Sequence, residues 1–249
     1  MRVRARYLGA SFLRFPMSFD LVALDADDTL WHNEPIFVAT QAAFRDLLAA
    51  HHDDPDAIGA RLGEAEIRNL QHYGYGIKGF LLSMVETAVE LTGGRVTGAE
   101  IQKILDLGRE MIHHPVVLLD GVAEAVEALA GTHRLALVTK GDLLDQEAKL
   151  ARSGLGDAFH AVEVLSEKDA RTYARTMQRL GVAPERFLMV GNSLRSDVLP
   201  VLDAGGAAVH IPYHTTWAHE VVADDALDGR AFTRLDRLAD LPVWLESVG

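Results

Sequence analysis

Asp25 and Asp27 follow directly on an apolar run and are separated by one residue. The run predicts a buried strand over residues 21–25, which places both carboxylates at its carboxyl end, where open α/β sheets build their ligand sites. In a turn just past the strand, one carboxylate and one backbone carbonyl can converge on a single point. Because Mg²⁺ prefers such oxygen ligands, the segment indicates metal-assisted chemistry. The alternative is an ordinary turn with Thr29 as a helix N-cap.

Three further polar segments come at the ends of strand-like runs. Thr139 and Lys140 close the second run, and Lys168 follows the third. Asn192 and Asp197 follow the fourth. Taken singly, Lys168 could be a solvated lysine and Thr139 a hydroxyl bonded to its own backbone. Taken together, these residues share one edge of one sheet with the two aspartates, because the carboxyl ends of parallel strands meet there.

The elements that must position these residues alternate between strand-like and helical patterns. Strands are predicted over residues 21–25, 135–139, 161–165, 187–191 and 207–212. Helices between them are predicted over residues 142–153, 170–180 and 195–204. Strands that alternate with helices form a parallel sheet with right-handed crossovers. The prediction is an α/β fold, with a Rossmann-like parallel sheet core and helices on both faces.

The interval between the first two strands is far longer than an ordinary crossover and is helical in pattern. Amphipathic runs cover residues 36–50, 55–71, 80–91 and 97–112. The last run begins with a capping box of Thr97 and Glu100. We expect an all-helical cap at residues 34–115 that acts as a lid on an α/β core, which comprises residues 17–33 and 116–249.

Residues 1–16 are expected to be a poorly ordered extension, because Met17 leads straight into the first strand.

The composition of the whole chain excludes several classes of function. The 249 residues include 36 Asp and Glu against 24 Lys and Arg, and the formal net charge is −12. That balance argues against a nucleic-acid-binding surface, which carries a basic patch.

No apolar run approaches the roughly 18 residues of a membrane span. The absence of cysteine excludes disulfides, thiolate catalysis and Cys-based zinc sites. We expect a cytoplasmic protein with no nucleic-acid or membrane partner, and the oligomeric state is left open.

The four polar segments, in this order and with a cap-sized gap between the first two, resemble the haloacid dehalogenase-like (HAD) hydrolase superfamily. The branch they resemble is that of the phosphatases with a helical cap inserted after the first strand. The resemblance covers nearly the whole chain from Met17 onward. It implies Mg²⁺ as the cofactor and a reaction through an aspartyl-phosphate. Asp27 favours the phosphatases, since the dehalogenases lack an acid at this position because halide leaves without protonation.

The resemblance implies a role for each segment. Asp25 would be the nucleophile that attacks phosphorus, and the side chain of Asp27 would be the general acid and then the base. Thr139 and Lys140 would bind the phosphate of the substrate. Lys168 would hold the same phosphate and offset the charge of Asp25.

The implied metal ligands are Asp25, the backbone carbonyl of Asp27, and one residue of the fourth segment. Many relatives have an aspartate where this chain has Asn192. The amide oxygen of Asn192 can bind Mg²⁺ but carries no charge. Asp197 is then either the anionic ligand or acts from outside the coordination sphere, and both possibilities stay open.

Substrate specificity is expected in the cap. The segment 72–78 joins two cap helices and combines glycines with two tyrosines and a lysine. In related caps a loop at this place dips into the active site, so Tyr75 and Lys78 are candidate substrate-binding residues. An ordinary glycine turn with its tyrosines packed on the cap is an equal alternative.

The predicted function is a Mg²⁺-dependent phosphomonoester hydrolase that acts through an aspartyl-phosphate. Its partner would be a small soluble phosphorylated metabolite of the nucleotide or sugar phosphate class. One alternative is a phosphotransferase or phosphomutase, which passes the phosphoryl group to another acceptor under a cap that excludes water. Another is a non-catalytic phosphate-binding regulatory protein, which Asn192 permits but the joint presence of Asp25, Asp27, Thr139 and Lys168 argues against.

Overall fold

The computed structural model describes residues 6–7 and 18–249, with side chains described from residue 18 onward. The expectation for residues 1–16 therefore falls mostly outside the described residues, and within that segment Arg6–Tyr7 form the short strand β1.

The chain divides into two compact units. The first, called the α/β unit below, comprises the chain up to His32 together with Val116–Thr139 and Lys149–Gly249. The second, the helical unit, comprises Asn33–Pro115 and Lys140–Ala148.

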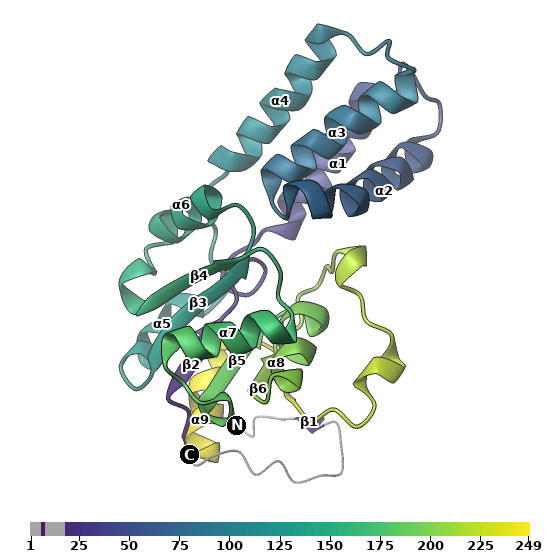
Figure 1. The fold of residues 1–249 in the computed structure, drawn as a ribbon. Helices are drawn as coiled ribbons and strands as arrows, with labels where there is room; N and C mark the ends of the chain where they lie inside the picture. The colour runs from purple at the N-terminus through teal and green to yellow at the C-terminus, as the bar shows by residue number, and fades with distance from the viewer. Residues whose placement is uncertain (1–5, 8–17) are drawn as a thin grey trace. The chain divides into compact units, whose positions relative to one another are not determined.

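The α/β unit is built on a seven-stranded sheet in the order β1-β7-β6-β5-β2-β3-β4 (Figure 1). The strands are β1, β2 (Leu21–Leu24), β3 (Arg134–Lys140), β4 (Ala161–Leu165), β5 (Phe187–Gly191), β6 (Ala207–His210) and β7 (Thr233–Arg234). Pairing is parallel from β7 across to β3, and β1 is antiparallel to β7. Leu24 of β2 lies opposite Leu137 of β3 and Val190 of β5, so these three strands end at one edge.

Helices cover both faces of this sheet, and the side chains of β2 alternate between them. Val22 and Leu24 pack in one core with α5 (Val122–Ala130) and α9 (Leu241–Val248). Leu21 and Ala23 pack in another core with α7 (Ala170–Leu180) and α8 (Leu199–Asp203). Burial on both faces is the reason that β2 and β5 are apolar throughout rather than alternating.

Four helices make up most of the helical unit (Figure 1). They are α1 (Glu34–Leu48), α2 (Pro55–Tyr73), α3 (Ile77–Thr92) and α4 (Gly98–His113). Their apolar faces enclose a separate core that includes Phe44 and Met84. Local sequence sets their beginnings: Asp54 caps α2, and Thr97 and Glu100 form the predicted capping box of α4. The helix α6 (Leu143–Ser153) begins in this unit and ends in the α/β unit.

The predicted α/β fold with helices on both faces of the sheet is confirmed. The sequence prediction omitted α5, α9 and the edge strand β7. The helix predicted over residues 195–204 is instead a π-helical turn, Leu194–Val198, followed by the short α8. The turn widens because the carbonyl of Ser193 accepts the N–H groups of both Asp197 and Val198.

Short 3₁₀ turns complete the described chain at Gly156–Ala158, Pro184–Arg186, Ala218–Glu220, Asp224–Leu227 and Leu238–Asp240.

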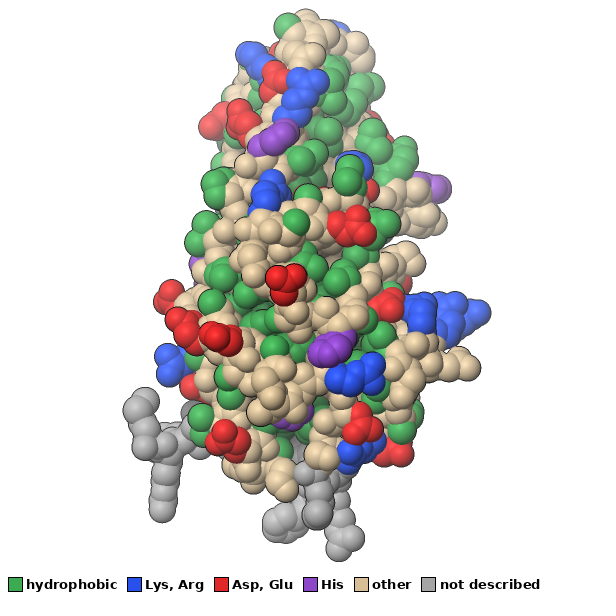
Figure 2. All heavy atoms as spheres, turned by 90° about the vertical axis from the view of Figure 1, so that its left-hand side faces the viewer, with side chains coloured by type: hydrophobic (Ala, Val, Ile, Leu, Met, Phe, Trp, Pro, Cys, Tyr) green, Lys and Arg blue, Asp and Glu red, His purple; other side chains and the backbone are tan. Residues whose placement is uncertain are grey.

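Acidic and basic side chains are interspersed on the surface shown in Figure 2. Within the part of the chain that the structure describes, no helix combines the length and the apolar character needed to cross a membrane.

Candidate active site

Asp25 lies immediately after β2, at the carboxyl edge of the sheet. Its N–H donates to the carbonyl of Val190 at 2.9 Å, so the residue continues the pairing with β5. The residue is buried, with 7% of its surface exposed. Lys168 Nζ donates to Oδ1 of Asp25 at 2.5 Å, and Thr29 Oγ1 donates to Oδ2 at 3.2 Å. The first and third predicted segments therefore meet at this carboxylate.

Lys168 is shared between two carboxylates. Its Nζ also donates to Oδ1 of Asp197 at 2.6 Å, and its side chain is 2% exposed. Burial favours the neutral amine, but Asp197 and Asp25 outweigh burial and raise the pKa of Lys168 well above its ordinary value. Lys168 is therefore a fixed positive charge at this edge.

The buried cluster of Asp25, Asp197 and Lys168 holds two carboxylates for one ammonium. Burial raises the pKa of Asp25 to about 7 against the opposing attraction of Lys168, and the negative charge of Asp197 adds to the rise. A nucleophilic carboxylate must be ionised. A second positive charge beside Asp25 would hold it in that form, so the electrostatics of the cluster favour a bound cation.

Oxygen atoms converge beside Asp25. One terminal atom of the Asn192 side-chain amide lies 3.3 Å from Oδ2 of Asp25 and 3.3 Å from the carbonyl oxygen of Asp27. This atom is the oxygen or the nitrogen, depending on how the amide is turned. With the amide oxygen turned inward, these oxygens face one another at close to the spacing of about 3 Å that neighbouring Mg²⁺ ligands adopt. With the amide nitrogen turned inward, the side chain donates to both oxygens instead. The residues present therefore fit a small oxygen-ligated cation.

Asp197 is engaged by the protein itself. Its Oδ1 accepts from Lys168, and its Oδ2 accepts the N–H of Ser193 at 3.0 Å. The loop can fold back in this way because residue 191 is glycine: a Cβ on Gly191 would lie 2.2 Å from Oδ2 of Asp197. Asp197 therefore supports Lys168, and the amide of Asn192 is the group of this loop that faces Asp25 and the carbonyl of Asp27.

Among the described residues, no group of three or more His, Cys, Asp or Glu side chains is arranged to hold a metal ion. A cation at this edge would depend on the mixed set of one carboxylate, one carbonyl and one amide.

The side chain of Asp27 has two partners that the sequence analysis missed. Trp31 Nε1 donates to Oδ1 of Asp27 at 2.7 Å. Lys149 Nζ lies 3.0 Å from Oδ1 and 3.2 Å from Oδ2. Asp28, inside the same turn, has a left-handed φ of 60°, a conformation that aspartate tolerates better than most residues. The turn brings Trp31 back to Asp27, whereas Lys149 arrives from α6 with no local signal.

Glu220 braces the loop that carries Asn192. Its carboxylate accepts from the hydroxyl of Ser193 and, at 2.7 Å, from the hydroxyl of Ser196. Tyr173, from α7, donates to the carbonyl of Ser196 at 3.0 Å. These contacts hold the loop after β5 in place, and none of them follows from local sequence.

Thr139 is buried at the end of β3. The residues that follow it belong to the helical unit and contact the loop between α2 and α3. Lys140 Nζ lies 3.9 Å from the centroid of the Tyr75 ring, and Lys78 donates to Asp142 at 2.9 Å. The substrate-binding candidates Tyr75, Lys78 and Lys140 therefore make their contacts within the helical unit. Of these, Lys140 directly follows Thr139 in the sequence.

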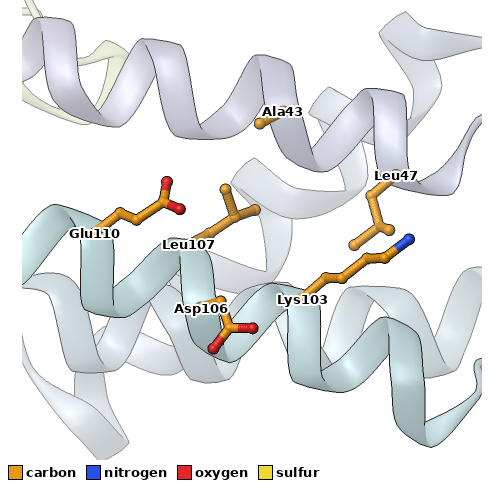
Figure 3. Close-up of a pocket in the computed structure, with 6 residues that line it drawn as sticks. All are labelled: Ala43, Leu47, Lys103, Asp106, Leu107 and Glu110. Carbon is orange, nitrogen blue, oxygen red and sulfur yellow. The ribbon is translucent and has the colours of Figure 1, made fainter.

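A groove in the helical unit contains none of the predicted site residues. It lies between α1 and α4 (Figure 3) and is lined by Ala43, Leu47, Lys103, Asp106, Leu107 and Glu110. The groups that could perform chemistry on a phosphate lie instead at the carboxyl edge of the sheet.

Comparison with known proteins identifies the family of the chain. The haloacid dehalogenase-like hydrolase family matches residues 19–205. A haloacid dehalogenase-like family hydrolase from Xanthomonas campestris, whose crystal structure is known, is 40% identical with a TM-score of 0.79, and the match covers 93% of this chain and 92% of that chain.

Two curated relatives have phosphatase names. Pyrimidine 5'-nucleotidase YjjG of Escherichia coli (strain K12) is 25% identical over 215 residues, which are 80% of this chain and 88% of the relative. Glyceraldehyde 3-phosphate phosphatase of Methanothermobacter thermautotrophicus is 30% identical over 115 residues, 44% of this chain. The chain spans 51% of the length of that second relative.

The chain belongs to the haloacid dehalogenase-like hydrolases. The resemblance drawn from the four polar segments is therefore confirmed, and the protein is an enzyme of this family.

Proposed function

We propose that the protein is a Mg²⁺-dependent phosphomonoesterase that acts through an aspartyl-phosphate on Asp25. The observation that supports this most directly is the position of the Asp25 carboxylate. It lies between the buried ammonium of Lys168 and the oxygen set formed with Asn192 and Asp27. A carboxylate attacks a phosphate dianion only where positive charge offsets the repulsion between them.

In the proposed reaction, an oxygen of Asp25 forms a bond to phosphorus as the bond from phosphorus to the ester oxygen breaks. The side chain of Asp27 gives its proton to the leaving oxygen. Asp27 then takes a proton from a water whose oxygen attacks phosphorus, and the bond to Asp25 breaks to release phosphate. Thr139 and Lys168 hold the phosphate oxygens throughout.

Hydrolases of this family generally use Mg²⁺. In this chain Asp25, the carbonyl of Asp27 and Asn192 would hold it, and the ion would screen the charge between nucleophile and phosphate. Lys168 and Asp197 complete the charge arrangement from the other side of Asp25.

The proposed substrate is a small phosphate monoester of the nucleotide or sugar phosphate class. Both curated relatives carry names of enzymes that act on such esters, a pyrimidine 5'-nucleotide and glyceraldehyde 3-phosphate. The test is a panel of nucleoside monophosphates and triose and hexose phosphates with Mg²⁺, scored for released phosphate, with excess chelator as the control. Transfer to an added alcohol or sugar would indicate a phosphotransferase. Binding of phosphate without release from any ester would indicate a regulatory protein.

Replacing Asn192 by Asp is expected to raise the affinity for Mg²⁺, on the order of tenfold, because it adds a negative charge to the ligand set. The measurement is the dependence of the unfolding temperature on Mg²⁺ concentration, which needs no turnover. Gln178→Glu adds the same charge at an exposed position of α7 and serves as the control. An unchanged Mg²⁺ dependence in Asn192→Asp would show that residue 192 does not bind the ion.

We also propose that residues 34–115 form a cap whose loop at 72–78 selects the substrate, with hinges near residues 32–34 and 115–116. Tyr75 and Lys78 support this, because they contact the segment that directly follows Thr139. Opening and closing of the cap would admit the ester and then exclude water during phosphoryl transfer.

Tyr75→Ala and Lys78→Ala are expected to change the ranking of kcat/KM among phosphate esters by about tenfold, while the smallest esters keep their rate. Tyr73→Ala, which removes an exposed tyrosine from the end of α2, is the matched control. If both variants preserve the wild-type ranking, the loop is an ordinary glycine turn.

A further inference from the structure

The side chain of Asp27 is held by donors from two separate elements. Trp31 Nε1 donates to Oδ1 at 2.7 Å, and Lys149 Nζ lies within 3.2 Å of both carboxylate oxygens. Lys149 is 8% exposed, and a lysine is rarely buried to this extent unless it is paired. The pair joins residues 122 positions apart in the chain. Two donors from separate elements restrict the orientation of this short carboxylate.

The backbone around Asp27 is fixed as well. Asp27 and Trp31 form an isolated bridge, and the N–H of Asp28 donates to the carbonyl of Trp31 at 2.8 Å. The remaining freedom of Asp27 is therefore rotation of its own side chain. Lys149 and Trp31 restrict that rotation.

The contacts of Lys149 indicate how it acts. Its side chain is 9% exposed, and its ammonium contacts both carboxylate oxygens of Asp27, whose side chain is 24% exposed. Lys149 therefore acts on the reaction through Asp27. Its near-complete burial also excludes a simple role as a surface charge that attracts anions.

We propose that Lys149, assisted by Trp31, is a positioning residue that sets the orientation of the general acid and base Asp27. The inference rests on the proposed function, in which one carboxylate first gives a proton to the leaving oxygen and then takes one from water. Both transfers occur on the same side of the phosphorus, one after the other. A carboxylate of fixed direction serves both, and a misplacement of about 1 Å can cost about 10²-fold in rate.

A purely structural role for Lys149 makes a different prediction. If Lys149 only compensates the charge of Asp27, its loss would lower stability and affect all substrates alike. If it positions Asp27, its loss would matter in proportion to the need of the leaving group for a proton. An alkoxide needs that proton, whereas p-nitrophenolate leaves without it.

The experiment compares Lys149→Met with wild type in single-turnover release of the alcohol from an alkyl phosphate and from p-nitrophenyl phosphate. We expect about a 10²-fold loss on the alkyl ester, little loss on the p-nitrophenyl ester, and an unchanged KM. Arg152→Met, at an exposed position of the same helix, is the control and should match wild type. Trp31→Phe removes the second donor and should show the same leaving-group pattern more weakly, which provides a test even if Lys149→Met does not fold.

A double-mutant cycle with Asp27→Asn completes the test. If Lys149 acts through Asp27, Lys149→Met causes no further loss on the alkyl ester once Asp27 is Asn. Losses that multiply in the double variant, or a loss of equal size on both esters, overturn the positioning role. Failure of the proposed function looks different, because wild type itself would then release neither alcohol nor p-nitrophenol.

Discussion

Replacement of Asp25 by Asn is expected to abolish phosphate release and, in the absence of a divalent cation, to make the protein more stable. The amide cannot form the bond to phosphorus that the proposed reaction requires. Burial raises the pKa of Asp25 to about 7, so the ionised carboxylate is unfavourable in the cation-free site near neutral pH. Asn has nearly the same shape and no charge. The expected gain at pH 8 is on the order of 1–3 kcal/mol.

The pH dependence of this gain has a defined sign. The pKa of Asp25 in the folded protein lies above its ordinary 3.8, so the folded state holds the proton more tightly and stability falls as the pH rises from 3.8 to about 7. Glu66, whose pKa is also raised to about 7 by burial and by Glu34, contributes in the same direction. The difference between wild type and Asp25→Asn isolates Asp25.

Thermal unfolding with chelator at pH 5 and pH 8 measures both effects. The stabilisation by Asp25→Asn should be larger at pH 8 than at pH 5. It should shrink when Mg²⁺ is added, because the ion binds wild type more tightly than the variant. A variant that is less stable than wild type at pH 8 without Mg²⁺, or one that still releases phosphate, contradicts the assignment.

Lys168→Met should have the opposite effect on stability. Lys168 is bonded to Asp25 and Asp197, and its removal leaves two buried carboxylates without their cation. Loss of one partner from a buried ion pair costs about 3–5 kcal/mol. The variant should also lose phosphate release, since nothing then offsets the charge of Asp25 from that side.

Two comparisons separate this effect from ordinary loss of a lysine. Lys103→Met removes an exposed lysine of α4 and should change stability little. In the Lys168→Met background, Asp197→Asn should restore part of the stability, because one uncompensated charge is removed. The loss should also become smaller as the pH falls and Asp25, whose pKa is raised by burial, takes up a proton. Denaturant unfolding of these four proteins measures each step, and a loss in Lys168→Met as small as in Lys103→Met would refute the role of the buried cluster.

The local sequence determined the framework of this protein. The strands β2 and β5 are buried on both faces and have continuous apolar runs, so they could be recognised without any tertiary information. The runs of β3, β4 and β6 are apolar enough to be recognised as well. Because parallel strands share a carboxyl edge, the positions of Asp25, Thr139, Lys168 and Asn192 at strand ends already placed them near one another. Capping residues such as Thr97 and Glu100 were equally readable, because a cap is a contact within one turn.

The tertiary structure decided what depends on contacts between distant segments. Asn192 and Asp197 both follow β5, and only the folded loop shows that Asp197 is bonded to Lys168 while Asn192 faces Asp25 and the carbonyl of Asp27. Lys149 had no signal in the sequence, because the buried face of α6 carries the polar residues Asp145 and Gln146 as well as Lys149, while Leu143 and Leu144 are exposed. Its partner lies 122 residues away, and no local pattern encodes a contact between elements that meet only when the sheet and its helices pack.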